Sequence, residues 1–113
     1  MKEMSLKYLT DILMAIELIE DFTKEIIDFN LYELDRKTQS AVERQLVIIG
    51  EALNKFSKLE SEIIIHNDKQ IVGFRNRLVH AYDSIDNSIV WVILKKYLNP
   101  LKLEIEKIIK QNQ

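Results

Sequence analysis

Residues that turn the chain or break a helix are scarce, and this scarcity limits the fold more than any other feature. The 113 residues include only two Gly and one Pro, so there are few places for sharp turns or helix breaks. Leu, Ile, Glu and Lys dominate the sequence, and all of these except Ile rank high in helix propensity. The sequence therefore favours a protein built from helices.

The apolar residues of the first half recur in steps of three and four, which is the period of an amphipathic helix. The first series predicts a helix that ends near Asn30, followed by a short connection over residues 30–35 with about one helical turn. A second series predicts a long helix from Arg36 to Lys58. The first series is Tyr8, Ile12, Ala15, Ile19, Phe22 and Ile26, and the second is Val42, Leu46, Ile49, Leu53 and Phe56.

The second half is expected to add further helices. Residues 61–68 read as a short helix or a packed loop, and a third helix is predicted from Asp68, as its N-cap, to about Ala81. Asp86 or Asn87 is expected to cap a fourth helix, which should run to about residue 98.

Pro100 favours the start of a last helix, because proline fits the first helical turn. The predicted fold is all-α, an antiparallel bundle of four or five helices, in a single domain over residues 1–113.

Composition and charge narrow the functional classes. Without Cys, neither disulfides nor thiolate metal sites can form. The formal net charge of −2 argues against a protein that binds nucleic acid through a broad basic face, although a few focused cations could still hold RNA. No apolar run approaches membrane-spanning length and no leader segment is evident. A soluble cytoplasmic protein is therefore expected.

The segment RNRLVHAY, Arg75 to Tyr82, carries most of the candidate chemistry. On a helical wheel, Ile71, Phe74 and Leu78 form the core stripe of the third helix, and Gly73, Asn76 and His80 cluster on the opposite side. Arg75 lies about 140° from His80, so the two cannot reach one small group on a regular helix. Either the helix ends or distorts near His80, or another chain completes the site. From the residues alone, this polar cluster could contact a phosphate or simply be solvated.

Three segments together resemble the HepT-like family of HEPN-domain toxins, which are paired with minimal nucleotidyltransferase antitoxins. RNRLVHAY is similar to the family's motif of Arg, four residues, His, one residue and Tyr. ERQLVIIGEALNK, residues 43–55, resembles the family's second-helix signature with its Gly-Glu-Ala step. IDNSIVWVIL, residues 85–94, resembles the segment that follows the motif. The matches occur in the expected order over most of the chain.

This resemblance implies a metal-independent endoribonuclease without a cofactor, acting on tRNA or mRNA. In such an enzyme the RNA 2′-OH attacks the adjacent phosphorus, which requires proton transfer and a cation near the developing negative charge. The resemblance gives the first role to His80, because histidine exchanges protons near neutral pH. Arg75 takes the second, because its planar group can contact two phosphate oxygens. Asn76 would orient His80 or the phosphate.

The resemblance also implies partners and a means of control. Family members are typically homodimers whose two motifs line a shared cleft, and a partner nucleotidyltransferase can transfer AMP to the hydroxyl of Tyr82. Two alternatives remain open. The chain could be a non-catalytic module that binds the nucleotidyltransferase or a nucleotide, or a purely structural helical dimer.

Other polar residues give weaker signals. Glu51 lies seven residues beyond Arg44 on one helix face, so the two could form an exposed ion-pairing face or support the cleft. His66 reads as an ordinary loop residue and Trp91 as a core residue. With two His and no Cys, no metal cluster is evident, although a Mg²⁺ site made of carboxylates alone remains open.

Overall fold

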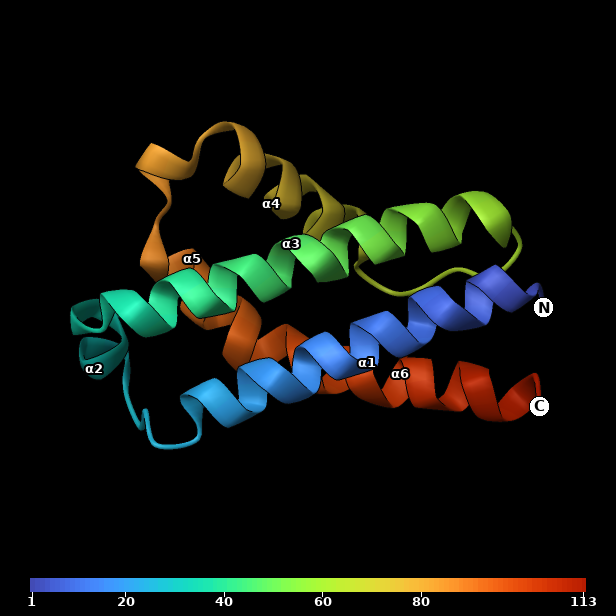
Figure 1. Cartoon of the computed structure of the whole chain (residues 1–113), viewed down its shortest axis with the longest axis horizontal. Helices are drawn as coiled ribbons and strands as arrows, with labels where there is room; N and C mark the ends of the chain where they lie inside the picture. The colour runs from blue at the N-terminus through green and yellow to red at the C-terminus, as the bar shows by residue number, and fades with distance from the viewer.

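A computed structural model shows a bundle whose long helices run antiparallel (Figure 1). It describes residues 1–81 and 83–113, and the side chain of Tyr82 lies outside this description. The α-helices are α1 (Glu3–Thr23), α2 (Phe29–Leu34), α3 (Arg36–Leu59), α4 (Asp68–His80), α5 (Asn87–Val92) and α6 (Leu98–Gln111), with a 3-10 turn η1 (Tyr82–Ser84) and a π-helical segment η2 (Ile93–Tyr97). The described residues contain no β-strand. The predicted all-α antiparallel bundle is confirmed.

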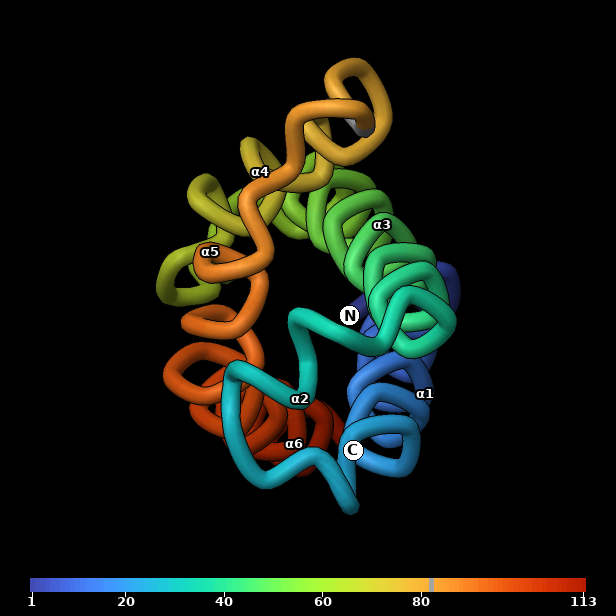
Figure 2. Tube along the Cα trace, turned by 90° about the vertical axis from the view of Figure 1, so that its left-hand side faces the viewer, coloured from blue at the N-terminus to red at the C-terminus, as the bar shows by residue number. Residues whose placement is uncertain are grey.

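The helices surround one apolar core. Seen end-on, they follow one another around the core in the order α1, α3, α4, α5 and α6, so α4 lies between α3 and α5 (Figure 2). The principal helix contacts are α1 with α3, α3 with α4 and α1 with α6. Fully buried side chains of α1 and α3 make up most of the centre. They include Leu9, Ile12, Ile16, Ile19, Val42, Ile49, Leu53 and Phe56, and all of these except Leu9 and Ile16 belong to the two apolar series named above.

The end of α1 differs from the prediction. The helix ends at Thr23 and not near Asn30, and a turn closes when the backbone N–H of Ile26 bonds to the Thr23 carbonyl at 3.0 Å. Asp28 then caps α2 by accepting a hydrogen bond from the backbone of Leu31 at 3.0 Å. The apolar series continues through the turn because Ile26 is still partly buried, so its period does not mark where the helix stops.

The second long helix agrees with the prediction within one residue. It begins at Arg36, and Asp35 accepts the N-cap hydrogen bond from the backbone of Thr38 at 3.0 Å. At its other end Glu60 accepts hydrogen bonds from the buried hydroxyl of Ser5 at 2.6 Å and from the backbone N–H of Lys2 at 2.9 Å. These contacts join the end of α3 to the start of α1.

Residues 61–67 form a packed loop, one of the two expected alternatives. Ile65 is buried, and the backbone N–H of His66 donates to the carboxylate of Glu104 at 3.0 Å. The assignment of Asp68 as N-cap was wrong, because Asn67 occupies the cap position and Asp68 is the first helical residue. Asn67 has a φ of 64°, a left-handed conformation that Asn tolerates better than most residues.

The expected separation of the last two helices at Pro100 was also wrong. Asp86 does cap α5, as predicted, but α5, η2 and α6 then continue as helical backbone from Asn87 to Gln111. In η2 the Leu98 N–H bonds to the carbonyl of Ile93, five residues back. A wider π turn relieves the clash between a proline ring and the preceding turn, so Pro100 is accommodated without a break.

Candidate active site

The site begins with a close approach of α3 and α4. Gly50 lies in α3 opposite Arg75 of α4, and a Cβ atom at Gly50 would overlap the Arg75 Cβ and lie 2.7 Å from its Cγ. A residue with any side chain would therefore push the two helices apart. The absence of a side chain at Gly50 fixes how deeply Arg75 sits against α3.

The Arg75 guanidinium is held by two acceptors. Its Nη2 donates to Oε1 of Glu51 at 2.9 Å, and its Nη1 donates to Oδ1 of Asn76 at 2.6 Å. Its Nε is buried and has no partner within the described residues. The Arg75 side chain is 25% exposed, so the group is held in place yet still reaches the surface.

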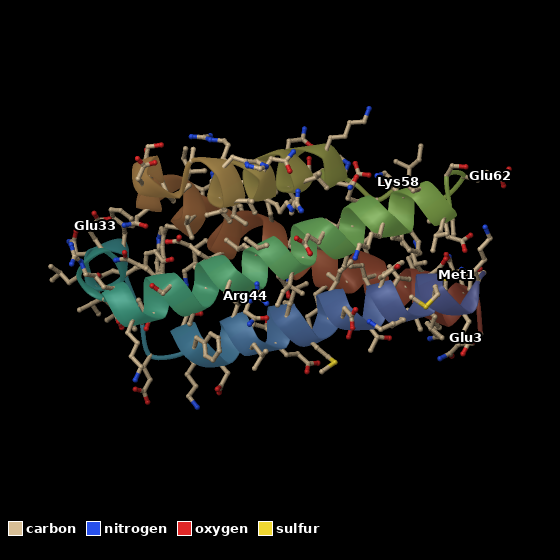
Figure 3. The ribbon with its side chains drawn as sticks, turned by 45° about the horizontal axis from the view of Figure 1, so that its top comes forward. Met1, Glu3, Glu33, Arg44, Lys58 and Glu62 are labelled. Carbon is tan, nitrogen blue, oxygen red and sulfur yellow. The ribbon has the colours of Figure 1, made fainter. Side chains whose placement is uncertain are left out.

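Glu51 responds electrostatically to this contact. The pKa of Glu51 is lowered, mainly by the hydrogen bond from Arg75. Partial burial raises the pKa and so opposes this shift, whereas the nearby positive charges of Lys55 and Arg44 lower it further. Glu51 was expected either to pair on an exposed face or to support a cleft. The structure gives it Arg75 as its partner. Arg44 forms no ion pair with the described residues and lies exposed on α3 (Figure 3).

The contact between Arg75 and Glu51 is the part of the site that sequence reasoning missed. Its signal was the Gly-Glu-Ala step at residues 50–52, where a glycine that permits close helix contact stands beside a carboxylate. Asn76, which was expected to orient His80 or the phosphate, accepts a hydrogen bond from Arg75.

His80 is the last residue of α4 and is exposed. The helix ends directly after His80, as one of the two alternatives from the helical wheel required, and the Ala81 N–H still bonds to the Arg77 carbonyl at 2.8 Å. The backbone from Arg75 to His80 is therefore regular helix, and its end does not bring the two side chains together. Within the described part of the chain, no hydrogen bond joins the His80 side chain to Arg75, Asn76 or Glu51. Arg75, Asn76 and Glu51 therefore form one group, and His80 lies apart from it on the same helix.

The remaining candidates take different places. Tyr82, the expected AMP acceptor, lies outside the described residues. His66 is an exposed loop residue, as predicted. Trp91 is only partly buried: its ring packs against Tyr32 with centroids 5.5 Å apart, and the Lys95 ammonium lies 4.5 Å from its centroid.

Among the described residues, no group of three or more His, Asp or Glu side chains could hold a metal ion. No helix among these residues is long and apolar enough to cross a membrane.

Comparison with known proteins places the chain in a family. The family model described as "Ribonuclease HepT-like" matches residues 12–108, a range that includes α3, α4 and nearly all of the bundle. The chain therefore belongs to the HepT-like ribonuclease family, as its motifs suggested.

Two relatives illustrate the similarity. The "Probable ribonuclease HepT" of Thermococcus cleftensis is 42% identical over 112 residues, which cover 96% of this chain and 98% of the relative. The protein named "Putative RNase MJ0125" from Methanocaldococcus jannaschii is 36% identical over 104 residues, which cover 91% of this chain and 89% of that protein. No solved structure gave a significant match.

Proposed function

We propose that this protein is an endoribonuclease that cleaves cellular RNA, tRNA or mRNA, by attack of a 2′-OH on the adjacent phosphorus. His80 accepts the proton of the 2′-OH as the 2′-oxygen bonds to phosphorus, and Arg75 stabilises the negative charge that develops on the phosphate oxygens. The bond from phosphorus to the 5′-oxygen then breaks, the 5′-oxygen leaves with a proton returned from His80, and a 2′,3′-cyclic phosphate remains. These two side chains supply both the proton transfer and the cation, so we propose that the reaction does not require a metal ion. The family membership and the names of the relatives support this class of activity.

The observation that carries the proposal is the fixed position of Arg75. A solvated arginine would not need a glycine opposite it, a carboxylate at 2.9 Å and an amide at 2.6 Å. Positioning a charged group in advance is what makes electrostatic catalysis effective, because no reorganisation is then required during the reaction. Asn76 is a positioning residue in this scheme, since it acts through Arg75.

We further propose that the active unit is a homodimer. Arg75 and His80 lie on different sides of one helix, and α4 is regular between them, so one phosphate would not reach both in a single chain. A second copy could bring its own His80 to Arg75 across a shared cleft. It would also bring more arginines to the cleft, which would offset the acidic net charge of the chain.

Regulation by a nucleotidyltransferase antitoxin is also part of the proposal. Transfer of AMP to the hydroxyl of Tyr82 would add bulk and negative charge two residues after His80, and this would repel an RNA phosphate. The resemblance of the motif supports this assignment. Intact-mass analysis after incubation with the partner and ATP should show added AMP, and equal modification of Tyr82→Phe would overturn the choice of acceptor.

The decisive experiment expresses the protein and two variants, His80→Ala and Arg75→Ala, without any partner. Only the wild type should arrest growth and cleave RNA, and each variant should lose activity by about 100-fold or more. Purified wild type should cleave equally well in EDTA, which tests metal independence. Equal RNA stability in all three strains would favour a non-catalytic module that binds the nucleotidyltransferase.

A mixing experiment tests the dimer. If each site combines Arg75 from one copy with His80 from the other, unfolding and refolding the two inactive variants together should restore part of the activity. No recovery, from a mixture whose mass is twice that of the 13.4 kDa chain, would show that each site lies within one copy.

A further inference from the structure

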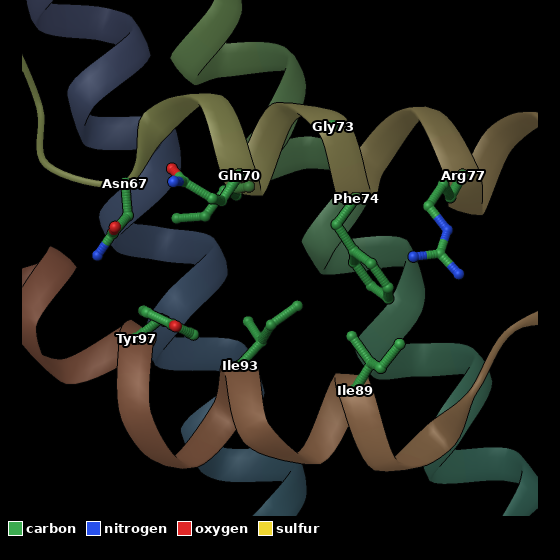
Figure 4. A pocket seen from close by; sticks show the side chains of 9 residues that line it. Asn67, Gln70, Gly73, Phe74, Arg77, Ile89, Ile93 and Tyr97 are labelled. Atoms are coloured by element: carbon green, nitrogen blue, oxygen red, sulfur yellow. The ribbon is translucent and has the colours of Figure 1, made fainter.

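A cavity separates α4 from α5 and η2. It has a volume of about 420 Å³, within the range of sites that bind small ligands. Its walls are largely apolar, with Ile71 and Phe74 on α4 facing Ile89 and Ile93 on the opposite side (Figure 4). The buried contacts of α4 are made mainly with α3, and the side toward α5 is left hollow.

Polar groups stand at the ends of this cavity. Asn67 and Gln70 lie at the end nearer the start of α4, close to Tyr97, and Arg77 lies at the other end beside Phe74 (Figure 4). The guanidinium carbon of Arg77 is 5.9 Å from the centroid of the Phe74 ring. An apolar slot with aromatic rings, two amides and a cation matches a nucleotide, whose base stacks and forms hydrogen bonds while its phosphate carries charge.

Gly73 borders the same cavity. Unlike Gly50, a Cβ atom at Gly73 would meet nothing within 4 Å, so the packing of the chain gives no reason for a glycine there. Glycine inside a helix is unfavourable compared with alanine. Gly73 is exposed, so the edge of the cavity at this position is open to a ligand that enters from solvent.

Arg77, which lines one end of the cavity, precedes the proposed catalytic residue His80 by three residues on α4. Gly73, Arg77 and His80 are spaced by four and three residues along α4, so they follow one side of the helix. A strand of RNA whose phosphate lies near His80 would therefore have Arg77 and then the cavity as its next neighbours. Single-stranded RNA is commonly recognised through bases that leave the stack and enter such pockets.

We propose that the cavity between α4 and α5 binds one unstacked nucleobase of the RNA substrate, adjacent to the phosphate that is cleaved. Phe74 and Tyr97 provide aromatic contact, Asn67 and Gln70 read the edge of the base, and Arg77 holds the flanking phosphate. This inference rests on the proposed ribonuclease function and adds to it a site that determines base preference.

The test uses DNA strands that contain one ribonucleotide, so that only one bond can be cleaved. In matched strands, the base of that nucleotide or of either neighbour is removed. Wild type should lose about tenfold or more in kcat/KM at one of these positions, the usual scale for a stacked base. Gly73→Leu, which adds a large side chain at the edge of the cavity, should cleave the intact strand about tenfold more slowly and should no longer respond to removal of that base.

A control variant and a second cavity variant distinguish a change in base binding from a folding defect. Thr10→Leu adds the same side chain at an exposed position of α1 and should respond to base removal as the wild type does. Gln70→Leu leaves the cavity open and should change the order of preference among the four bases. Thermal melts should show that all variants remain folded.

The outcomes separate this inference from the function on which it rests. If wild type and Gly73→Leu cleave equally and respond equally to base removal, the cavity proposal is wrong and the ribonuclease stands. If Gly73→Leu changes the mass of the assembly, a second copy fills the cavity and the proposal is also wrong. If wild type cleaves nothing, calorimetry with the four nucleoside 3′-monophosphates decides: binding weakened about tenfold by Gly73→Leu supports the cavity site, and no binding overturns it.

Discussion

The two sides of α4 are built in opposite ways, and the two glycines of the chain mark the difference. On the α3 side, Gly50 allows backbone and side chain to approach so closely that a Cβ atom would overlap Arg75. On the α5 side, Gly73 faces open space beside a cavity of about 420 Å³. The tight side holds a charged group in place, and the open side leaves room for a ligand. The proposed site uses both sides of one helix.

The largest expected effect on stability comes from shortening buried side chains, one in the tightly packed core and one on the wall of the cavity. Ile49→Ala, in the fully buried centre of α3, should lower the free energy of unfolding by about 4 kcal/mol. Ile93→Ala, on the cavity wall, should cost about 2 kcal/mol, because its side chain already lacks neighbours on one side. Urea denaturation of both variants measures this difference. Equal losses would show that the cavity wall is packed as well as the core.

A methyl group at Gly50 should disturb the tight side. Gly50→Ala should lower the free energy of unfolding by about 1–3 kcal/mol, because α4 must move away from α3. RNA cleavage should fall with it, since Arg75 would lose its position against Glu51. Thermal melts and a cleavage assay test this, with Ser40→Ala at an exposed site of α3 as the control. Unchanged stability and activity would mean that the helices do not approach as closely as described.

Substitution by alanine at Gly73 should stabilise the protein, whereas the same substitution at Gly50 should destabilise it. Gly73→Ala should raise the free energy of unfolding by about 0.5–1 kcal/mol, because alanine favours helix and nothing lies within reach of its methyl group. A thermal melt beside that of Gly50→Ala gives the comparison directly. A loss of stability at Gly73 would show that this side of α4 is covered by another part of the protein.

The smallest effect concerns the charge pair on the tight side. Because the pKa of Glu51 is lowered below its ordinary value of 4.5, the pair with Arg75 stabilises the protein above about pH 4.5 and loses this effect as the pH falls through the lowered pKa. Glu51→Gln should therefore be less stable than wild type at pH 7, by less than about 1 kcal/mol because the pair is partly exposed. The difference should shrink as the pH falls below 4.5 and the Glu51 carboxylate becomes protonated. A difference independent of pH would show that hydrogen bonding, and not charge, accounts for the contact.

Most of the helices could be predicted because their signal is local. The apolar steps of three and four in α3 placed its start correctly and its end within one residue, and the wheel of α4 separated Ile71, Phe74 and Leu78 from Asn76 and His80. The errors fall where the local signal was misleading. Ile26 continued the apolar series beyond the end of α1. Pro100 suggested a break between two helices, but the helical backbone continues through the π segment η2.

The sequence by itself determined the helical class, the core faces and the segment that carries Arg75 and His80, because periodicity and motif spacing depend only on neighbours along the chain. The tertiary structure alone decided that Glu51 and Asn76 hold Arg75, and that Gly50 closes one side of α4 while Gly73 borders a cavity on the other. These features depend on which helix lies beside α4 and at what distance. Two glycines that look alike in the sequence differ only in what the folded chain places opposite them.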